Sequence, residues 1–396
     1  MSLTYNGFVA VAVIAFAAPL LRELVPALVV PAVVLELLAG VILGPHGLDL
    51  VSIDTPTTVF AQIGLAFLLF LAGLEVRLDK IEPRVAKLAG AAFVTSFVIA
   101  LVASYLLHLT GLVRTPLLVA ITFVATSLGI VLVPLKDGRQ LGTHYGKLVI
   151  ATASLAELGS IVLLSFFFSA KRPGFSTELL HIGAFAIFAL ALYLVLTHGR
   201  AGRVWRAIDR LADSTSQLRV RADFALVGVA VLAAVKLGLE AILAAFTLGM
   251  IRGLADRDRA INQEKVDAIA FGIFVPFFFI TSGLRFDVGA LFASPSSAVR
   301  LPLFLCVLAL VHMVPALFFR RELGARGALA AGLMLSTSLS FVVVATGIGT
   351  ELDLMSSATS AALVGAGLLS VVLFPAMSMA LARGEPAGRA AALAEP

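Results

Sequence analysis

The sequence predicts an all-α polytopic membrane protein, and three observations support that prediction. Hydrophobic residues make up 60% of the chain, and charged residues make up only 13%. The mean hydropathy is +1.05, outside the range of soluble globular domains. Apolar windows of about 20 residues, enough to cross a bilayer as a helix, recur from one end of the chain to the other. No phosphate-binding loop, His/Cys metal spacing or serine-hydrolase elbow is present, so we do not expect an enzyme.

Apolar runs bounded by turn residues predict about thirteen transmembrane helices. The first run has no basic residue ahead of it and no small-residue cleavage site, so we expect a retained helix and not a signal peptide. In order along the chain, the expected helices are 5–21, 28–44, 57–75, 85–107, 115–133, 148–169, 178–197, 222–238, 240–254, 267–284, 301–319, 327–349 and 355–381.

The basic residues predict how the chain is oriented in the cell (cytoplasmic) membrane. With the N-terminus outside, all but six of the 29 Lys and Arg residues fall on the cytoplasmic side, where the C-terminus also lies. Cytoplasmic loops of membrane proteins carry such an excess. The net charge of +5 therefore indicates topology, and we expect membrane lipid and not nucleic acid as a partner. The six outer residues are Arg114, Lys171, Arg172, Lys236, Arg285 and Arg300.

The longest hydrophilic connection divides the chain into two halves. Residues 1–197 form the first half, an N-terminal helix followed by a first repeat, and residues 222–381 form the second repeat. Between them, residues 198–221 place arginines at helical spacing, which predicts a cytoplasmic amphipathic linker. An unstructured linker is the alternative for its second part. Residues 382–396 form a short cytoplasmic tail.

Three short segments of the first half recur in order in the second half, at offsets of 209 to 211 residues, which predicts an internal duplication. Because the offset spans an odd number of helices, one copy is inverted relative to the other. Inverted repeats are typical of secondary transporters, whose sites lie where the repeats meet. The matching pairs are LAGVILG (38–44) with TLGMIRG (247–253), FLAGLEVRLD (70–79) with FITSGLRFD (279–287), and TSLGIVLV (126–133) with TSLSFVVV (337–344).

Small hydroxyl residues interrupt two of the expected helices at matching repeat positions. Discontinuous helices at this depth expose backbone carbonyls and helix-end dipoles to a bound ion. Alternatively, Ser and Thr in membrane helices bond back to their own helix or support close packing. The two interruptions are Ala125-Thr126-Ser127 and Ser336-Thr337-Ser338.

The expected helix 148–169 contains one charged residue, Glu157, near its middle. A carboxylate at this depth costs about 2.5–3.5 kcal/mol on insertion scales. Ser154 and Ser160 lie three residues to either side on the same face, and they offer oxygen ligands to a small cation or hydrogen bonds to a protonated carboxyl. If a proton and Na⁺ or K⁺ compete for Glu157, and only occupied forms change sides, the result is antiport. The alternative is a protonated glutamic acid that bonds to a neighbouring helix.

Four segments resemble the bacterial cation/proton antiporters of the monovalent cation:proton antiporter-2 family, which contains the NapA-type sodium and Kef-type potassium exchangers. The segments follow the family's order, and the resemblance covers essentially the whole chain. It implies an inverted-repeat antiporter fold with two crossed discontinuous helices, and a dimerising panel of helices that makes a homodimer. The segments are ELLAGVILGP (36–45), FLLFLAGLEVRL (67–78), ATSLGIVLVPLKDGRQLG (125–142) and FFFITSGLRFDVGAL (277–291).

The resemblance also implies that Glu157 binds both the proton and the cation. The family's paired acids fall on Ala156 and Glu157, so the second acid is kept and the first is absent. The family's partner lysine falls near Met313, beside His312, and STSLS (336–340) stands where many relatives have an acidic motif. Single-acid members tend to be electroneutral, which implies one proton per monovalent cation.

Three further residues are accessory candidates. Glu36 falls at an acidic position of the family, where it either gates the cytoplasmic funnel or bonds to an interrupted backbone. His312, just before Pro315, is either a pH-responsive partner for Glu157 or a simple hydrogen-bond donor. Arg285 follows a repeated Gly-Leu pair, and we expect it to end its helix.

We therefore expect a secondary-active antiporter that exchanges protons for Na⁺ or K⁺ by alternating access, serves pH homeostasis and needs no cofactor. The altered sites leave two alternatives. One is a carrier of the same architecture for a small organic solute or ionophore-type drug, and the other is a non-transporting sensor or assembly subunit. The short tail leaves no room for the nucleotide-sensing domain of Kef-type relatives, so we expect no regulation through it.

Overall fold

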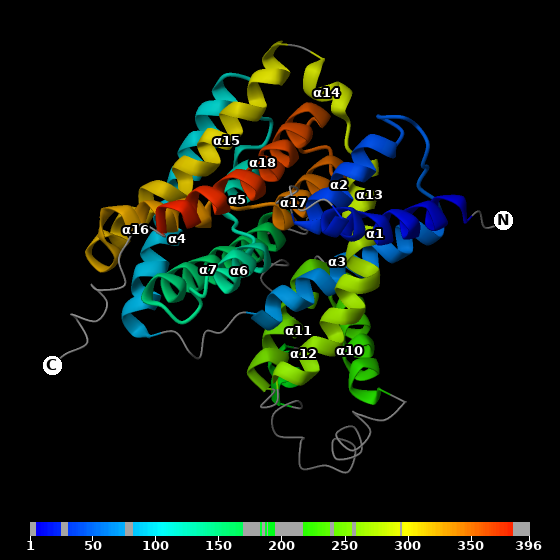
Figure 1. Ribbon diagram of the computed structural model, residues 1–396, viewed down its shortest axis with the longest axis horizontal. Helices are drawn as coiled ribbons and strands as arrows, with labels where there is room; N and C mark the ends of the chain where they lie inside the picture. Colours follow the sequence, from blue (N-terminus) through cyan, green and yellow to red (C-terminus); the bar gives the residue numbers. More distant parts are fainter. Residues whose placement is uncertain are drawn as a thin grey trace. The chain divides into compact units, whose positions relative to one another are not determined.

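The computed structural model of the protein consists, in the residues it describes, of helices and the loops that join them (Figure 1). The expected helix 178–197, the linker 198–221 and the tail 382–396 lie wholly or largely outside these residues. The other expected helices are all found as helices, and two of them are interrupted. The residues described are 5–24, 31–75, 82–168, 183, 187, 189–194, 217–237, 241–255, 259–293 and 295–382.

Eight described segments are long and apolar enough to cross a membrane, so the chain is a multi-span membrane protein. Three further apolar helices are shorter than a full span: Ala32–Leu43, Ala241–Leu254 and Ser340–Glu351. The total of thirteen spans remains a prediction.

The chain forms two compact units, each of which combines helices from both halves of the sequence. The first unit comprises Met1–Lys80 and Ile161–Gly289, and the second comprises Ile81–Ser160 and Ala290–Pro396. Each unit therefore contains segments from before and after the middle of the sequence.

The first unit contains most of the shorter apolar helices. Its elements are α1 (Asn6–Leu24), α2 (Ala32–Leu43), α3 (Thr55–Glu75), α10 (Leu218–Lys236), α11 (Ala241–Ala255), α12 (Arg259–Ile269), the π-helix η3 (Ala270–Phe274) and α13 (Val275–Leu284). The short helix α14 (Val288–Phe292) lies at the boundary between the units.

Two pairs of helices in the first unit approach each other at glycines. Gly40 of α2 lies against Gly283 of α13, and Gly73 of α3 lies against the α11 backbone beside Gly249. A Cβ atom at any of these four glycines would collide with a backbone carbonyl of the facing helix. Gly40 and Gly249 are equivalent in the sequence repeats, as are Gly73 and Gly283. The packing follows the same pattern as the sequence matches. If α2 is replaced by its match α11, and α13 by its match α3, the contact between α2 and α13 becomes the contact between α11 and α3.

Two boundaries in this unit differ from the expected ones. Helix α10 begins at Leu218 and not at 222, so its first turn includes Arg219 and Arg221, whose long side chains a helix accommodates readily. The expected helix 267–284 begins at Arg259 and passes through the π-helix, whose widened turn no sequence signal marked.

A buried ion pair joins α10 to α11. Arg252 Nε lies 2.6 Å from Asp223 Oδ1, and Arg252 Nη2 lies 3.3 Å from Asp223 Oδ2. Both side chains are buried. Because the guanidinium meets the carboxylate at two points, each charge is compensated.

The second unit contains the interrupted helices. Its elements are α4 (Pro83–Leu109), α5 (Pro116–Val124), α6 (Leu128–Asp137), α7 (His144–Phe167, of which Ile161 onward falls in the first unit), α15 (Pro295–Ala316), the 3₁₀ turn η4 (Leu317–Phe319), α16 (Arg320–Leu335), α17 (Ser340–Glu351) and α18 (Ser357–Ala382). Helix α15 packs against α4, α16 and α18 (Figure 1). Gly324, with φ of +72°, lets the chain turn at the start of α16.

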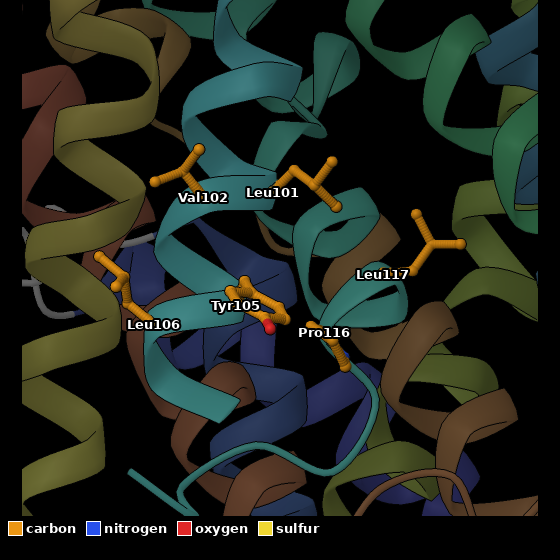
Figure 2. A pocket seen from close by; sticks show the side chains of 6 residues that line it. All are labelled: Leu101, Val102, Tyr105, Leu106, Pro116 and Leu117. Carbon is orange, nitrogen blue, oxygen red and sulfur yellow. The ribbon is translucent and has the colours of Figure 1, made fainter. Parts of the chain in front are cut away.

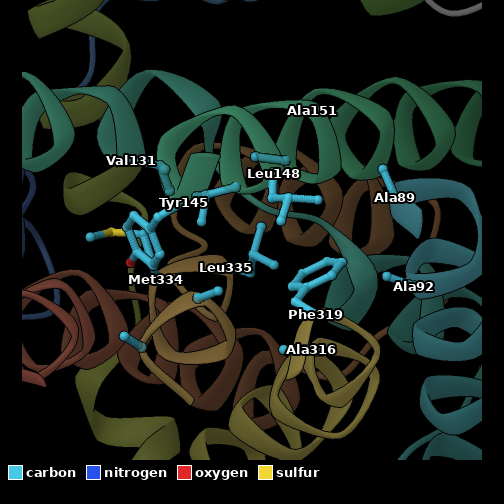
Figure 3. Packing of buried hydrophobic residues seen from close by; sticks show 14 of the residues in the cluster. Ala89, Ala92, Val131, Tyr145, Leu148, Ala151, Ala316, Phe319, Met334 and Leu335 are labelled. Atoms are coloured by element: carbon cyan, nitrogen blue, oxygen red, sulfur yellow. The ribbon is translucent and has the colours of Figure 1, made fainter. Parts of the chain in front are cut away.

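A buried apolar cluster holds this unit together. Leu148 of α7, Phe319 of η4 and Leu335 of α16 lie within it, and Ala89 and Ala92 of α4 line one side (Figure 3). Small alanines facing large side chains allow the helices to approach closely while the space between them stays filled.

A polar chain crosses the edge of the same cluster. The Tyr145 hydroxyl of α7 donates to Ser378 Oγ of α18 at 2.9 Å, and Ser378 donates to the Ala330 carbonyl of α16 at 2.7 Å. Three helices are thereby joined by hydrogen bonds inside an apolar region, which fixes their register.

The outer surface of α4 is apolar, as expected for a helix against lipid. Val94, Val98 and Leu106 are more than half exposed. Between α4 and α5 lies a shallow groove of about 390 Å³, in which the Tyr105 ring points toward Pro116 (Figure 2).

Candidate ion-binding site

The two interruptions meet inside the second unit. Helix α5 ends at Val124 and α6 begins at Leu128, and Ala125 and Ser127 between them are extended. Helix α16 ends at Leu335, and α17 begins at Ser340. Non-helical backbone at membrane depth is stable only where protein groups satisfy its N–H and C=O groups.

Hydrogen bonds between the two interruptions pair several of these backbone N–H and C=O groups. The Ser127 N–H donates to the Thr337 carbonyl at 3.0 Å. The Ser127 hydroxyl oxygen accepts the N–H groups of Leu339 at 2.9 Å and Ser340 at 3.1 Å. One serine therefore satisfies two of the unpaired N–H groups at the start of α17.

Thr126 makes the reciprocal link. Its hydroxyl donates to the carbonyl of Leu335, the last residue of α16, at 2.8 Å. The expected discontinuous helices are thus present. The first interruption is bonded both to the end of α16, through Thr126, and to the start of α17, through Ser127.

Glu157 lies on α7 at the start of the half-helix α6. Its side chain is 4% exposed, and its Oε2 accepts the Leu128 N–H at 3.1 Å. Leu128 is the first residue of α6, so the carboxyl group sits at the positive end of that helix dipole. A carboxylate held there can be neutralised by a proton or by a cation.

Several hydroxyl groups of the same unit are buried and lack a bonding partner. Ser160 Oγ, Thr337 Oγ1 and Ser338 Oγ have none among the described residues. Ser154, one turn before Glu157, is also buried. Hydroxyl oxygens are ligands that hard cations accept. Within the described part of the chain, no three His, Cys, Asp or Glu side chains form a metal-binding group.

His312 of α15 lies beside the first interruption. It is 3% exposed, and its Nε2 is 3.2 Å from Thr126 Oγ1 and 3.2 Å from the Val124 carbonyl oxygen. The sequence marked His312 as a candidate, and the structure brings it to Thr126.

The other two accessory candidates belong to the first unit. Glu36 is buried in α2, and its Oε2 has no partner among the described residues. Arg285 is exposed and directly follows Leu284, the last residue of α13, so the expected role in ending the helix fits its position.

Sequence reasoning missed Ser370 of α18. Its hydroxyl oxygen accepts the Ser338 N–H at 3.1 Å, and its proton goes to the Gly367 carbonyl at 2.7 Å. The motif GAGLLS (365–370) held a signal, because Gly367 and Ser370 share a helix face. A Cβ at Gly367 would lie 2.7 Å from the Ser338 carbonyl oxygen, so the glycine makes room for the second interruption.

A many-span helical protein in which two interrupted helices are bonded to each other, and one of them to a buried carboxyl group, has the architecture of a secondary ion transporter. A family model described as "Sodium/hydrogen exchanger, transmembrane" matches residues 11–381. The chain belongs to this family of membrane transporters, so it is grouped with transporters and not with enzymes.

Individual proteins show the same relationship. The chain is 29% identical over 384 residues to the putative Na⁺/H⁺ antiporter YjbQ of Bacillus subtilis, covering 93% of this chain and 62% of that protein. It is 24% identical to the probable Na⁺/H⁺ antiporter 3 of Methanocaldococcus jannaschii, covering 87% and 89%. It is 26% identical to the glutathione-regulated potassium-efflux protein KefC of Salmonella arizonae, covering 89% and 56%. The chain thus spans little more than half the length of YjbQ and KefC.

A solved structure shares the fold. The sodium proton antiporter MjNhaP1 from Methanocaldococcus jannaschii superposes with a TM-score of 0.65, over 96% of this chain and 98% of that one, at 17% identity. The expected resemblance to cation/proton antiporters is confirmed at the level of the family and the fold.

Proposed function

We propose that the chain is a monovalent cation/proton antiporter that works by alternating access, with Glu157 shared by the proton and Na⁺ or K⁺. The observation that supports this most directly is the carboxyl group of Glu157 at the start of α6, the half-helix that follows the first interruption, which is itself hydrogen-bonded to the second. The unpartnered hydroxyls of Ser160, Thr337 and Ser338 are oxygen ligands available in the same unit.

One carboxylate implies a one-for-one exchange. When a proton or a monovalent cation binds Glu157, either loaded form is neutral, so both can change sides without carrying net charge. We therefore propose electroneutral transport. The empty, ionised form is the costly one in a low-dielectric interior, which prevents return without a cargo.

The proposed membrane arrangement extends the fold. It has thirteen spans, an N-terminal helix and a first inverted repeat within residues 1–197, a second inverted repeat over 222–381, an outer N-terminus and a cytoplasmic C-terminus. Glycine contacts that follow the repeat correspondence support the duplication. Assembly as a homodimer in the cytoplasmic membrane is part of the same proposal.

The test is exchange in liposomes that contain a pH-reporting dye. Purified protein is reconstituted, Na⁺, K⁺ and Li⁺ are added in turn, and the membrane potential is clamped. We expect a cation-dependent pH change that is lost in Glu157→Gln and kept in Glu351→Gln, because Glu351 is exposed at the end of α17. Insensitivity to the imposed potential would support one-for-one exchange.

The absence of a cation-dependent pH change would lead to a different functional assignment. If folded wild-type protein gives no pH response to any cation, the antiport proposal fails. A small organic solute or a non-transporting role would then be tested instead.

A further inference from the structure

His312 is surrounded by oxygen atoms that can accept hydrogen bonds. Its Nδ1 lies 3.0 Å from the Leu308 carbonyl oxygen, and its Nε2 lies 3.2 Å from the Val124 carbonyl oxygen. A carbonyl oxygen accepts hydrogen bonds and never donates one. Each ring nitrogen therefore faces a hydrogen-bond acceptor, to which only a protonated nitrogen can donate.

The third neighbour of the ring, Thr126, behaves as an acceptor in this arrangement too. Its hydroxyl has one proton, which the 2.8 Å contact assigns to the Leu335 carbonyl. Thr126 Oγ1 then accepts from His312 Nε2 at 3.2 Å. All three oxygens around the ring accept, which is the hydrogen-bond pattern of a doubly protonated imidazolium.

The helix ends around His312 favour a positive charge. Val124 is the last residue of α5, and Leu335 is the last residue of α16, so their carbonyls belong to the negative ends of two half-helices. The Val124 carbonyl faces the ring directly, and the Leu335 carbonyl is reached through Thr126.

No other ionisable group of the surrounding elements is bonded to His312 in the described part of the chain. Elements α5, η4 and α18 contain none. Glu157 of α7, the buried carboxyl group of this unit, bonds to Leu128. The remaining ones on α4, α15 and α16 are Arg84, Lys87, Tyr105, His108, Arg300, Cys306, Arg320, Arg321, Glu322 and Arg326.

Removing one proton from the ring changes the bonding of Thr126. The Nδ1 contact with the Leu308 carbonyl, at 3.0 Å, is shorter than the Nε2 contact with the Val124 carbonyl, at 3.2 Å, so the tautomer that keeps the Nδ1 proton retains the shorter hydrogen bond. Nε2 then loses its bond to the Val124 carbonyl and can only accept a hydrogen bond, for which the Thr126 hydroxyl is the donor within reach. That hydroxyl has a single proton, so it must turn away from the Leu335 carbonyl. The hydrogen bond from the first interruption to the end of α16 is lost in the same event.

We propose that His312 is a proton-binding positioning residue, whose protonation determines whether Thr126 bonds to Leu335 and so ties the two interrupted helices together. It acts through Thr126 and is separate from Glu157, which we assign to the transported ions. Only its consequence for transport rests on the proposed exchange function.

The first experiment detects the proton without any transport. Protein with ¹⁵N-labelled histidine is titrated by NMR through the ordinary histidine range around pH 6.5, and His312→Gln identifies the His312 signals. We expect His312 to change protonation state within the titration. Thr126→Val, which removes the hydroxyl, should change its proton affinity by a factor of about 5 or more. Thr126→Ser, which keeps the hydroxyl, should leave the affinity close to that of the wild type.

Two results would overturn the inference. One is a His312 ring that keeps a single protonation state throughout. The other is a titration that Thr126→Val leaves unchanged. Thermal unfolding of each variant in detergent checks that it is folded.

The second experiment separates a proton-dependent role from a merely structural one. His312→Gln keeps an amide donor but does not titrate, so the pH profile of cation-driven exchange should lose one ionisation. A structural role would lower the rate equally at every pH, and an unchanged profile shape therefore rejects the inference. If the wild type exchanges no cation, the proposed antiport fails, and the NMR titration alone decides the role of His312.

Discussion

The two interrupted helices are built alike, but they differ in the group that satisfies the start of the second half-helix. At α6 that group is a carboxyl, Glu157, which accepts the Leu128 N–H. At α17 the acceptors are hydroxyls: Ser370 accepts the Ser338 N–H, and Ser127 accepts those of Leu339 and Ser340. A hydroxyl stays neutral at every physiological pH, whereas a carboxyl can change its charge. Under the proposed function, the first interruption would hold the exchanged ion and the second would support it.

Making the first interruption resemble the second should have the largest effect. We expect Glu157→Ser to reduce exchange in liposomes to the rate of empty vesicles, because no titrating group remains at α6. The shorter side chain also leaves the Leu128 N–H without its acceptor, which lowers the free energy of unfolding by about 1–3 kcal/mol. Glu157→Asp is the matched control, and it should keep measurable exchange. Exchange that persists in the serine variant would remove Glu157 from the mechanism.

Removing the hydroxyl that supports α17 should come next. Ser127→Ala leaves the N–H groups of Leu339 and Ser340 without acceptors, and we expect the free energy of unfolding to fall by roughly 2–5 kcal/mol. Chemical denaturation in detergent measures the change. Ser127→Thr keeps the oxygen and should lose far less. Equal losses in both variants would show that the hydrogen bonds are not the cause.

Ser370→Ala should have a smaller effect, because a single N–H, that of Ser338, loses its side-chain acceptor. We expect a loss of about 1–2 kcal/mol in the free energy of unfolding. The pH profile of exchange should keep its shape, since Ser370 does not titrate. A changed profile would contradict the division between a titrating and a supporting interruption.

A third helix start, that of α3, lies outside the membrane span and also has a carboxyl acceptor. We expect its removal to have the smallest effect of the changes considered. Asp54 precedes α3, and it accepts the Thr57 N–H at 2.9 Å and the Phe8 N–H at 3.0 Å. Burial raises the pKa of Asp54, but hydrogen bonds from Thr57, Phe8 and Gly7 outweigh burial, and the net pKa is lowered.

The lowered pKa of Asp54 determines the direction in which its contribution to stability changes with pH. The stabilisation by Asp54 is present above the unfolded-state pKa of about 3.9 and is lost as the pH falls through the lower folded-state value. Asp54→Asn should therefore weaken the acid dependence of the unfolding midpoint in detergent while leaving exchange intact. An acid dependence identical to that of the wild type would show that this carboxyl contributes nothing to it.

Features that depend on composition or on one unusual residue were predictable from the sequence. The helices follow from apolar runs, the interruptions follow from hydroxyl residues in those runs, and Glu157 is conspicuous as a charge at membrane depth. Ser370 was missed although Gly367 on the same helix face was a weak signal, because a lone serine in an apolar helix normally bonds to its own helix. It does so here, through Gly367, and its acceptor role depends on a contact with a distant segment.

The interleaving of the two units was not predictable either, since apolar patterns show that a face is buried but not which helix covers it. The repeat matches contained part of the answer. Gly40 and Gly283 lie in different halves of the sequence and touch each other, so each half supplies a packing partner of the other.

The bonds of Ser127 also set an order of events during synthesis. Leu128 and Glu157 are 29 residues apart, so their bond can form soon after α7 leaves the ribosome. The N–H groups that Ser127 accepts lie 212 and 213 residues further along the chain. At about 5–20 residues per second, that interval lasts on the order of 10–40 seconds. During most of that time the bond between Leu128 and Glu157 can already be present, while the Ser127 hydroxyl has not yet met Leu339 and Ser340.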